Sequence, residues 1–172
     1  MASTEDKTLR MAGVVENSFT DGPGVRFALF VQGCPHHCPG CHNPDTHDFQ
    51  GGKTDTTERI VRMMKDNPLL DGITLTGGDP FCQAAACAEL ARAAREAGLN
   101  VWAYSGWTYE QLLHKAETEP DVKELLSLTD VLVDGPFILA QRTLELRFRG
   151  SRNQRLIDVP VSLKTGNAVE KA

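Results

Sequence analysis

Short apolar runs alternate with segments of helical periodicity along the chain, a pattern typical of proteins in which strands and helices take turns. The run at 25–32 is apolar at nearly every position, which predicts a strand buried on both faces of a sheet. Similar runs predict further strands at 9–16, 72–76, 100–104 and 130–134. Helices are predicted between them, at 54–67, 83–98, 109–117 and 121–128.

The helix predicted at 54–67 carries both a start signal and an apolar side. Asp55 precedes Glu58 by three residues, which is the spacing of a helix-capping signal. The next predicted helix, 83–98, is rich in alanine and is ended by Gly98. In the first helix the apolar residues cluster on one side, so we assign them to the core: Ile60, Val61, Met63 and Met64.

Strands that alternate with helices favour a parallel sheet covered by helices. About five such units are too few for a complete eight-fold barrel, which typically needs about 250 residues. We therefore expect an α/β fold built as a partial (incomplete) βα barrel, with a mostly parallel sheet. A chain of 172 residues predicts one domain, at 9–160, between a flexible N-terminal tail at 1–8 and a C-terminal tail at 161–172.

Four loops rich in glycine or polar residues follow predicted strands directly. Because α/β folds bind ligands at the carboxyl ends of their parallel strands, we expect these loops to meet at one rim. They are the cysteine loop after 25–32, GGDP after 72–76, SGW after 100–104 and DGPF after 130–134.

Composition narrows the chemistry. The net charge is −5, with no long run of lysine or arginine, which argues against a nucleic-acid partner. The N-terminus has no apolar signal region and no apolar run reaches membrane-spanning length, so we expect a cytoplasmic protein without membrane contact. In that compartment, clustered cysteines indicate metal or redox chemistry rather than disulfides.

Three of the five cysteines lie within GCPHHCPGCHN, as Cys34, Cys38 and Cys41. Structural zinc would need a fourth ligand from a nearby histidine, but such sites usually combine two separated ligand pairs. Cys82 and Cys87 do not form a second pair, and we interpret them as small buried residues. An iron–sulfur cluster held by only three thiolates keeps one iron open to an external ligand. Histidines available to zinc are His36, His37, His42 and His47.

The C-x-x-x-C-x-x-C loop followed by GGDP on the next βα unit resembles the radical S-adenosylmethionine enzymes. This resemblance implies the partial barrel of that family and a [4Fe–4S] cluster held by Cys34, Cys38 and Cys41. It also implies that the fourth iron binds the amino and carboxylate groups of S-adenosylmethionine, which is cleaved reductively to a 5′-deoxyadenosyl radical.

Other motifs resemble the activases of glycyl-radical enzymes within that family. They are DGPGVR at 21–26 and CHNPDT at 41–46. LTGGDP, VWAYSGWTYEQL, DVLVDGPF and LRFRGSRNQRLIDV resemble the subgroup that acts on anaerobic ribonucleoside-triphosphate reductase, over residues 9–159. The resemblance implies that the glycyl-radical subunit of this reductase is the partner, and that a flavodoxin or ferredoxin donates the electron.

The resemblance also implies individual contacts to S-adenosylmethionine. Gly40 replaces an aromatic residue that contacts adenine in many members, which leaves that contact to the backbone around Cys41 and to His42. Gly77 and Gly78 would let the backbone approach the ligand, and Asp79 would accept from its amino group or cap a helix.

Further positions keep two interpretations each. Ser105 and Asp134 would hydrogen-bond the carboxylate or ribose, or else form turns and caps. Asp21 and Arg26 would lie near the active site, or in a plain turn. The segment 147–155 would dock a partner's acidic surface or form a solvated edge strand.

Two other functions remain open from the sequence. One is an enzyme of the same family with another target, such as an activase of pyruvate formate-lyase or a small-molecule enzyme. The other is a zinc-binding interaction module without catalysis.

Overall fold

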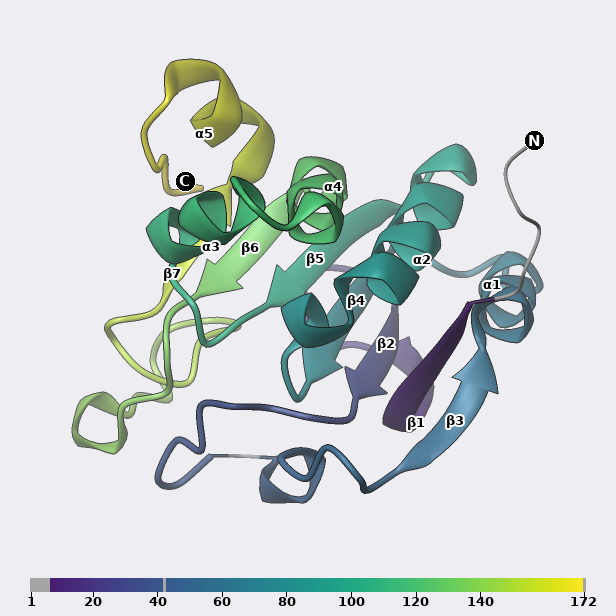
Figure 1. Cartoon of the computed structure of the whole chain (residues 1–172), viewed down its shortest axis with the longest axis horizontal. Helices are drawn as coiled ribbons and strands as arrows, with labels where there is room; N and C mark the ends of the chain where they lie inside the picture. Colours follow the sequence, from purple (N-terminus) through teal and green to yellow (C-terminus); the bar gives the residue numbers. More distant parts are fainter. Residues whose placement is uncertain (1–6, 42, 172) are drawn as a thin grey trace.

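The computed structural model describes residues 7–41 and 43–171 of the chain. In this part, seven strands form one sheet in the order β3-β1-β2-β4-β5-β6-β7 (Figure 1). Their bounds are Thr8–Ser18 (β1), Arg26–Val31 (β2), Lys53–Thr56 (β3), Gly72–Gly77 (β4), Asn100–Tyr104 (β5), Val131–Asp134 (β6) and Arg155–Asp158 (β7).

The helices α1 to α4 cover one face of this sheet (Figure 1). Strands β2, β4, β5 and β6 follow one another in one direction across the sheet, and right-handed crossovers between such strands place every helix on the same side. The α-helices span Thr57–Lys65 (α1), Ala84–Glu96 (α2), Tyr109–Ala116 (α3), Pro120–Leu128 (α4) and Val159–Thr165 (α5). Short 3-10 helices occupy Pro44–Thr46 (η1), Pro80–Gln83 (η2) and Leu139–Gln141 (η3).

The edges of the sheet differ from the mostly parallel sheet that we expected. Strands β2, β4, β5 and β6 pair in parallel, but β1 is antiparallel to β2 and β3, and β7 is antiparallel to β6. No helix lies between β1 and β2, and a chain that turns back without a crossover pairs antiparallel. The α/β class is confirmed, with a parallel centre. The strand order leaves the sheet open, so the partial barrel stays a prediction.

Successive side chains of a strand point to opposite sides of the sheet, so its two faces contain different residues. Phe27 and Leu29 of β2 belong to the main core, together with buried residues of α1, α2 and α4. Trp102 of β5 and Val133 of β6 form a second cluster on the opposite face, against which Phe148 packs. The second cluster therefore attaches the long loop between β6 and β7 to the sheet.

The start of α1 differs from the predicted capping signal. Its N-cap is Thr56, whose side-chain oxygen accepts a hydrogen bond from the Arg59 backbone N–H at 3.2 Å. Asp55 instead accepts from the Arg59 guanidinium at 2.9 Å. The helix was predicted to begin at residue 54, but residues 54–56 belong with Lys53 to the short edge strand β3, so this part of the prediction was wrong.

The described part of the expected C-terminal tail is attached to the sheet. After α5, the backbone N–H of Asp158 donates to Val169 O at 2.8 Å, and that of Lys171 donates to Leu156 O at 2.7 Å. Of the expected N-terminal tail only residues 7 and 8 are described, and β1 already begins at Thr8. The domain boundaries stay a prediction.

Candidate functional site

The loops after β2, β4, β5 and β6 all contribute to one cavity of about 740 Å³. Of the residues beside the cysteines that were predicted to contact S-adenosylmethionine, Gly77, Gly78 and Ser105 line this cavity, whereas Gly40 and Asp79 do not. The cysteine loop contributes Cys34, Cys38 and Cys41. The loops that follow the parallel strands therefore meet as predicted, and they enclose a cavity.

The three cysteines are free thiols on a loop that is shaped by a tight turn. Cys34 is buried, and burial raises the pKa of its thiol, while Cys38 and Cys41 are partly exposed. The Cys41 backbone N–H donates to Cys38 O at 3.1 Å, and Gly40 inside this turn has a φ of +75°. Glycine is favoured at that position because side-chain-bearing residues rarely adopt such a φ. The structure thus gives Gly40 a backbone role, its adenine contact stays a prediction, and His42 lies outside the described residues.

The GGDP turn is joined to the start of the cysteine loop by backbone contacts. The Gly78 N–H donates to Val31 O at 2.8 Å, and the Asp79 N–H donates to Gly33 O at 2.9 Å. A Cβ on Gly78 would overlap the Gly33 carbonyl, and one on Gly77 would lie 2.7 Å from Phe30 Cα. The missing side chains of these glycines therefore let the GGDP turn pack on the chain's own backbone, and their approach to a ligand stays a prediction.

Asp79 is 1% exposed and is surrounded by donors. Its Oδ2 accepts from Ser105 Oγ at 2.8 Å and from the Gly106 N–H at 3.0 Å, and lies 2.7 Å from His36 Nε2. Its Oδ1 accepts from the Phe81 N–H at 3.0 Å, which caps η2. Of the two predicted roles, the helix cap is thus seen. The binding of an ammonium group by Asp79 stays a prediction.

Ser105 holds Asp79 in place from the end of β5. Its hydroxyl donates to Asp79 and accepts from the Trp107 N–H at 3.1 Å, and Ser105 also lines the cavity. The Trp107 ring packs edge-on against His36, with ring centroids 4.6 Å apart. These contacts tie the loop after β5 to the cysteine loop. The contact of Ser105 with the ligand stays a prediction.

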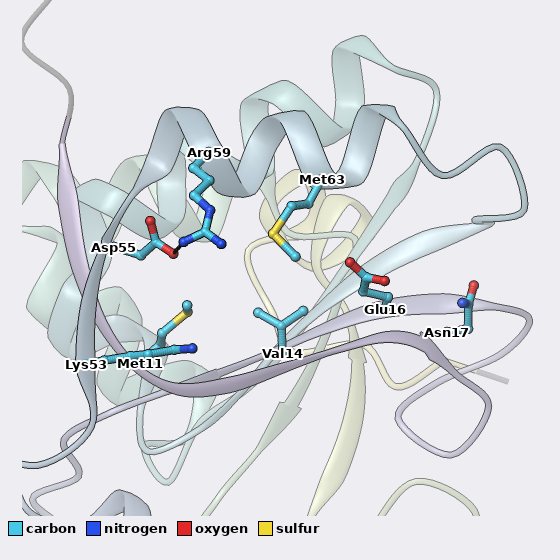
Figure 2. Close-up of a pocket in the computed structure, with 8 residues that line it drawn as sticks. All are labelled: Met11, Val14, Glu16, Asn17, Lys53, Asp55, Arg59 and Met63. Carbon is cyan, nitrogen blue, oxygen red and sulfur yellow. Dashed lines mark hydrogen bonds and ion pairs between the residues drawn. The ribbon is translucent and has the colours of Figure 1, made fainter.

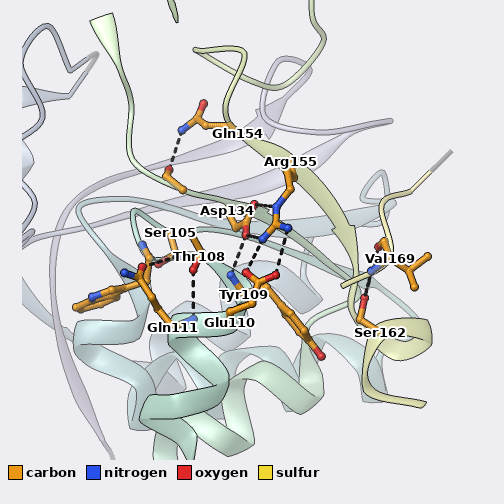
Figure 3. A network of polar contacts seen from close by, with 12 residues as sticks. Ser105, Thr108, Tyr109, Glu110, Gln111, Asp134, Gln154, Arg155, Ser162 and Val169 are labelled. Carbon is orange, nitrogen blue, oxygen red and sulfur yellow. Dashed lines mark hydrogen bonds and ion pairs between the residues drawn. The ribbon is translucent and has the colours of Figure 1, made fainter. Parts of the chain in front are cut away.

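Asp134 has a structural role at the end of β6 (Figure 3). Its carboxylate is 1% exposed and accepts from the Tyr109 N–H at 2.8 Å and from Arg155 at 2.5 and 3.1 Å. Arg155 also donates to Glu110 at 2.7 Å. These hydrogen bonds raise the pKa of Arg155, and the contact with Arg155 lowers the pKa of Glu110. Asp134 therefore joins β6, β7 and α3 and does not line the cavity.

Of the two residues around the DGPG loop that were predicted to lie near the active site, only one lines the cavity. Asp21 lines the cavity wall. Arg26 is fully buried instead and donates to Thr74 Oγ1 at 2.7 Å, Pro23 O at 3.0 Å and Ile73 O at 2.7 Å. Burial lowers the pKa of Arg26 to about 10. Arg26 thus holds the loop against β4 and has a supporting role.

The segment 147–154 forms part of the cavity wall, which the sequence did not predict. Gln154 accepts from the Gly150 N–H at 2.8 Å and donates to Gly135 O at 3.1 Å. Asn153 donates to Pro136 O at 2.8 Å. Only at Arg155 does the edge strand β7 begin. The polar side chains that suggested a solvated strand instead form hydrogen bonds within the loop between β6 and β7. The amide side chains clustered after Gly150 are the feature of the sequence that could have indicated such a loop.

The donor groups on the wall fit an iron–sulfur cluster with a polar ligand. Three buried side-chain nitrogen or oxygen atoms of the described residues lack a hydrogen-bond partner, and two of them, His47 Nε2 and Arg149 Nε, belong to residues that line this cavity. Buried polar atoms without partners are rare and mark places where a ligand can supply one. Across residues 7–41 and 43–171, no three His, Cys, Asp or Glu side chains lie close enough to hold a single metal ion, and this includes the three cysteines of the loop.

A second cavity, of about 470 Å³, lies between α1 and strands β1 and β3 (Figure 2). Its floor is apolar and its rim is charged, with Asp55 and Arg59 paired above it (Figure 2). It contains no cysteine and none of the predicted site residues. It is lined by Met11, Val14, Glu16, Asn17, Lys53, Asp55, Arg59 and Met63.

One protein family matches most of this chain. The family described as "4Fe-4S single cluster domain" matches residues 20–157. None of the described helices has both the length and the apolar character needed to cross a membrane. QueE from Escherichia coli, a solved structure, covers 59% of this chain and 53% of its own with a TM-score of 0.48 and 13% identity, which is too distant to bear on function.

Curated relatives are much closer in sequence. The anaerobic ribonucleoside-triphosphate reductase-activating protein of Vibrio cholerae is 37% identical over 78% of this chain and 88% of its own length. Proteins of the same name from Salmonella typhi and Enterobacteria phage T4 are 34% and 33% identical, over 78% and 80% of this chain and 88% and 86% of their own. The chain therefore belongs to the family of anaerobic ribonucleoside-triphosphate reductase-activating proteins.

Proposed function

We propose that this chain is a radical S-adenosylmethionine activase that generates the glycyl radical on anaerobic ribonucleoside-triphosphate reductase. One observation carries the proposal: three free thiols of a single loop line a cavity at the carboxyl ends of the parallel strands, in a chain of this family. The competing zinc module stays an alternative, and the metal content of the protein tests it.

In this proposal the cysteines Cys34, Cys38 and Cys41 hold three irons of a [4Fe–4S] cluster. When bound, the cluster supplies an electron that cleaves S-adenosylmethionine to a 5′-deoxyadenosyl radical, which takes a hydrogen atom from a glycine Cα of the partner. The chain's own residues position the reactants, because Asp79 and Ser105 fix the GGDP turn that is joined to the cysteine loop.

Exposed apolar side chains at the mouth of the cavity support access by a segment of a protein partner. Leu144 lines the cavity and is 89% exposed, and Leu139, on the same loop, is 51% exposed. Leu139 lies close to Gly40 of the cysteine turn, because a Cβ there would meet Leu139 Cδ1 at 2.9 Å. Exposed apolar groups beside a cavity are typical of surfaces that bind another chain. The glycine-bearing segment of the reductase would cover them.

The proposal includes a cytoplasmic location and an electron donor of the flavodoxin or ferredoxin type. Each cysteine of the chain is free in the structure, in keeping with a compartment that holds thiols reduced. The donor would reduce the cluster before S-adenosylmethionine is cleaved.

The direct test mixes cluster-loaded protein, S-adenosylmethionine and reductant with anaerobic ribonucleoside-triphosphate reductase in the absence of oxygen. We expect paramagnetic resonance to show a glycyl radical on the reductase, and none when S-adenosylmethionine is left out. A parallel sample with pyruvate formate-lyase examines the alternative target. A radical on pyruvate formate-lyase alone would contradict the assignment of the partner.

A further inference from the structure

Arg149 is the one arginine or lysine among the described residues that line the cysteine cavity. Asp21 is the one carboxylate among them. A fixed positive charge on a cavity wall attracts an anionic group, and a guanidinium is shaped to bind a carboxylate through two parallel hydrogen bonds.

The Arg149 side chain lacks partners within the described chain. Its Nε is buried and makes no hydrogen bond. Two other arginines of this segment are paired with carboxylates, since Arg152 contacts Glu145 at 3.0 Å and Arg155 contacts Asp134 and Glu110. A buried donor without an acceptor destabilises a protein, so its retention indicates an acceptor that arrives with a ligand.

The backbone around Arg149 is held in an unusual conformation. Phe148 has a φ of +64°, in the left-handed region that a residue with a bulky side chain rarely adopts. Its ring packs edge-on against Trp102, with centroids 5.2 Å apart, and so fixes residue 148 to the sheet. On the other side, Gly150 is held by Gln154. Backbone strain of this kind persists where the surrounding structure imposes it, often at binding sites.

We propose that Arg149 binds the carboxylate of the methionine end of S-adenosylmethionine, an inference that rests on the proposed function. The sulfonium and ammonium groups of this molecule are positive, and its carboxylate is the single anionic group that could complement a guanidinium. Arg149 is therefore a ligand-binding residue, contributed by a loop far along the chain from the cysteines.

The test compares cluster-loaded wild-type protein with the Arg149→Met variant in anaerobic equilibrium dialysis. The probes are S-adenosylmethionine and its decarboxylated analogue, which keeps the sulfonium and lacks the carboxylate. We expect the variant to bind S-adenosylmethionine about 10- to 100-fold more weakly, with the analogue changed by less than about threefold. Arg149→Lys should restore part of the affinity, because it keeps the charge and loses the paired hydrogen bonds.

Thermal unfolding of the cluster-free protein separates binding from a structural role. Arg149→Met should leave Tm within about 2 °C of wild type, because no partner is lost, whereas the control Arg155→Met should lower it by about 10 °C through loss of its contacts with Asp134. A fall as large as that of the control would overturn the inference.

Three binding outcomes would also overturn it. They are unchanged affinity of Arg149→Met for S-adenosylmethionine, equal weakening of both probes, and weakened binding of the reductase alone, which would assign Arg149 to the partner. If wild-type protein itself fails to bind S-adenosylmethionine, the proposed function fails first and the inference fails with it.

Discussion

Replacing Cys38 with alanine is expected to abolish cleavage of S-adenosylmethionine, leaving 5′-deoxyadenosine at the level found without enzyme. Cys38 is one of three thiols that line the cavity, and with two thiolates the loop cannot hold a cluster that normally needs at least three protein ligands. The other cysteines are badly placed to substitute, because Cys82 lines a different cavity and Cys87 is fully buried in α2. Quantification of 5′-deoxyadenosine after anaerobic reconstitution measures the effect.

Cys82→Ala provides the matched control, since it also removes one thiol. The interpretation of Cys82 as a buried residue was wrong, since it is exposed in the structure, whereas Cys87 is buried as expected. Cys82 also lies outside the cysteine loop, so this variant should keep its iron and its cleavage activity. Retained 5′-deoxyadenosine production by Cys38→Ala, or equal losses in the two variants, would count against the assigned role of the loop.

Replacing Gly78 with alanine is expected to destabilise the protein by about 3 kcal/mol and to impair cluster loading. The added Cβ would overlap the Gly33 carbonyl and lie 2.8 Å from its carbon, where backbone has little freedom to move. The strain falls on the hydrogen bond from Asp79 N–H to Gly33 O, which joins the GGDP turn to the cysteine loop. Chemical denaturation of the cluster-free protein gives the free energy of unfolding, and iron analysis gives the loading.

Gly13→Ala is the control for this substitution, because a Cβ at Gly13 would meet no atom within 4 Å. We expect its stability to stay within about 0.5 kcal/mol of wild type. A Gly78→Ala variant as stable as Gly13→Ala would show that the two loops are not packed as described.

The centre of the fold could be predicted because local sequence and burial agree there. The apolar run of β2 and the β-branched run of β4 are each buried along nearly their whole length, as their composition indicates. The edge strand β3 has the sequence KTDT, whose residues are polar, and it pairs with β1 only through contacts distant in sequence. Such a strand gives no apolar pattern to recognise.

The residues of the site that lie close together in the sequence could be predicted. The contacts between residues distant in the sequence could not. The spacing of Cys34, Cys38 and Cys41 is a property of one loop, so the sequence shows it directly. The contact of His36 with Asp79 joins positions 43 residues apart. The place of Arg149 depends on Phe148 meeting Trp102 on a distant strand. Neither arrangement follows from local spacing.

The most direct test of the central claim is the metal and sulfide content of protein purified without oxygen. If Cys34, Cys38 and Cys41 hold an iron–sulfur cluster that is open to S-adenosylmethionine, the reconstituted chain should contain about four iron and about four sulfide. Colourless protein with about one zinc per chain, no sulfide and no capacity for reconstitution would contradict the account.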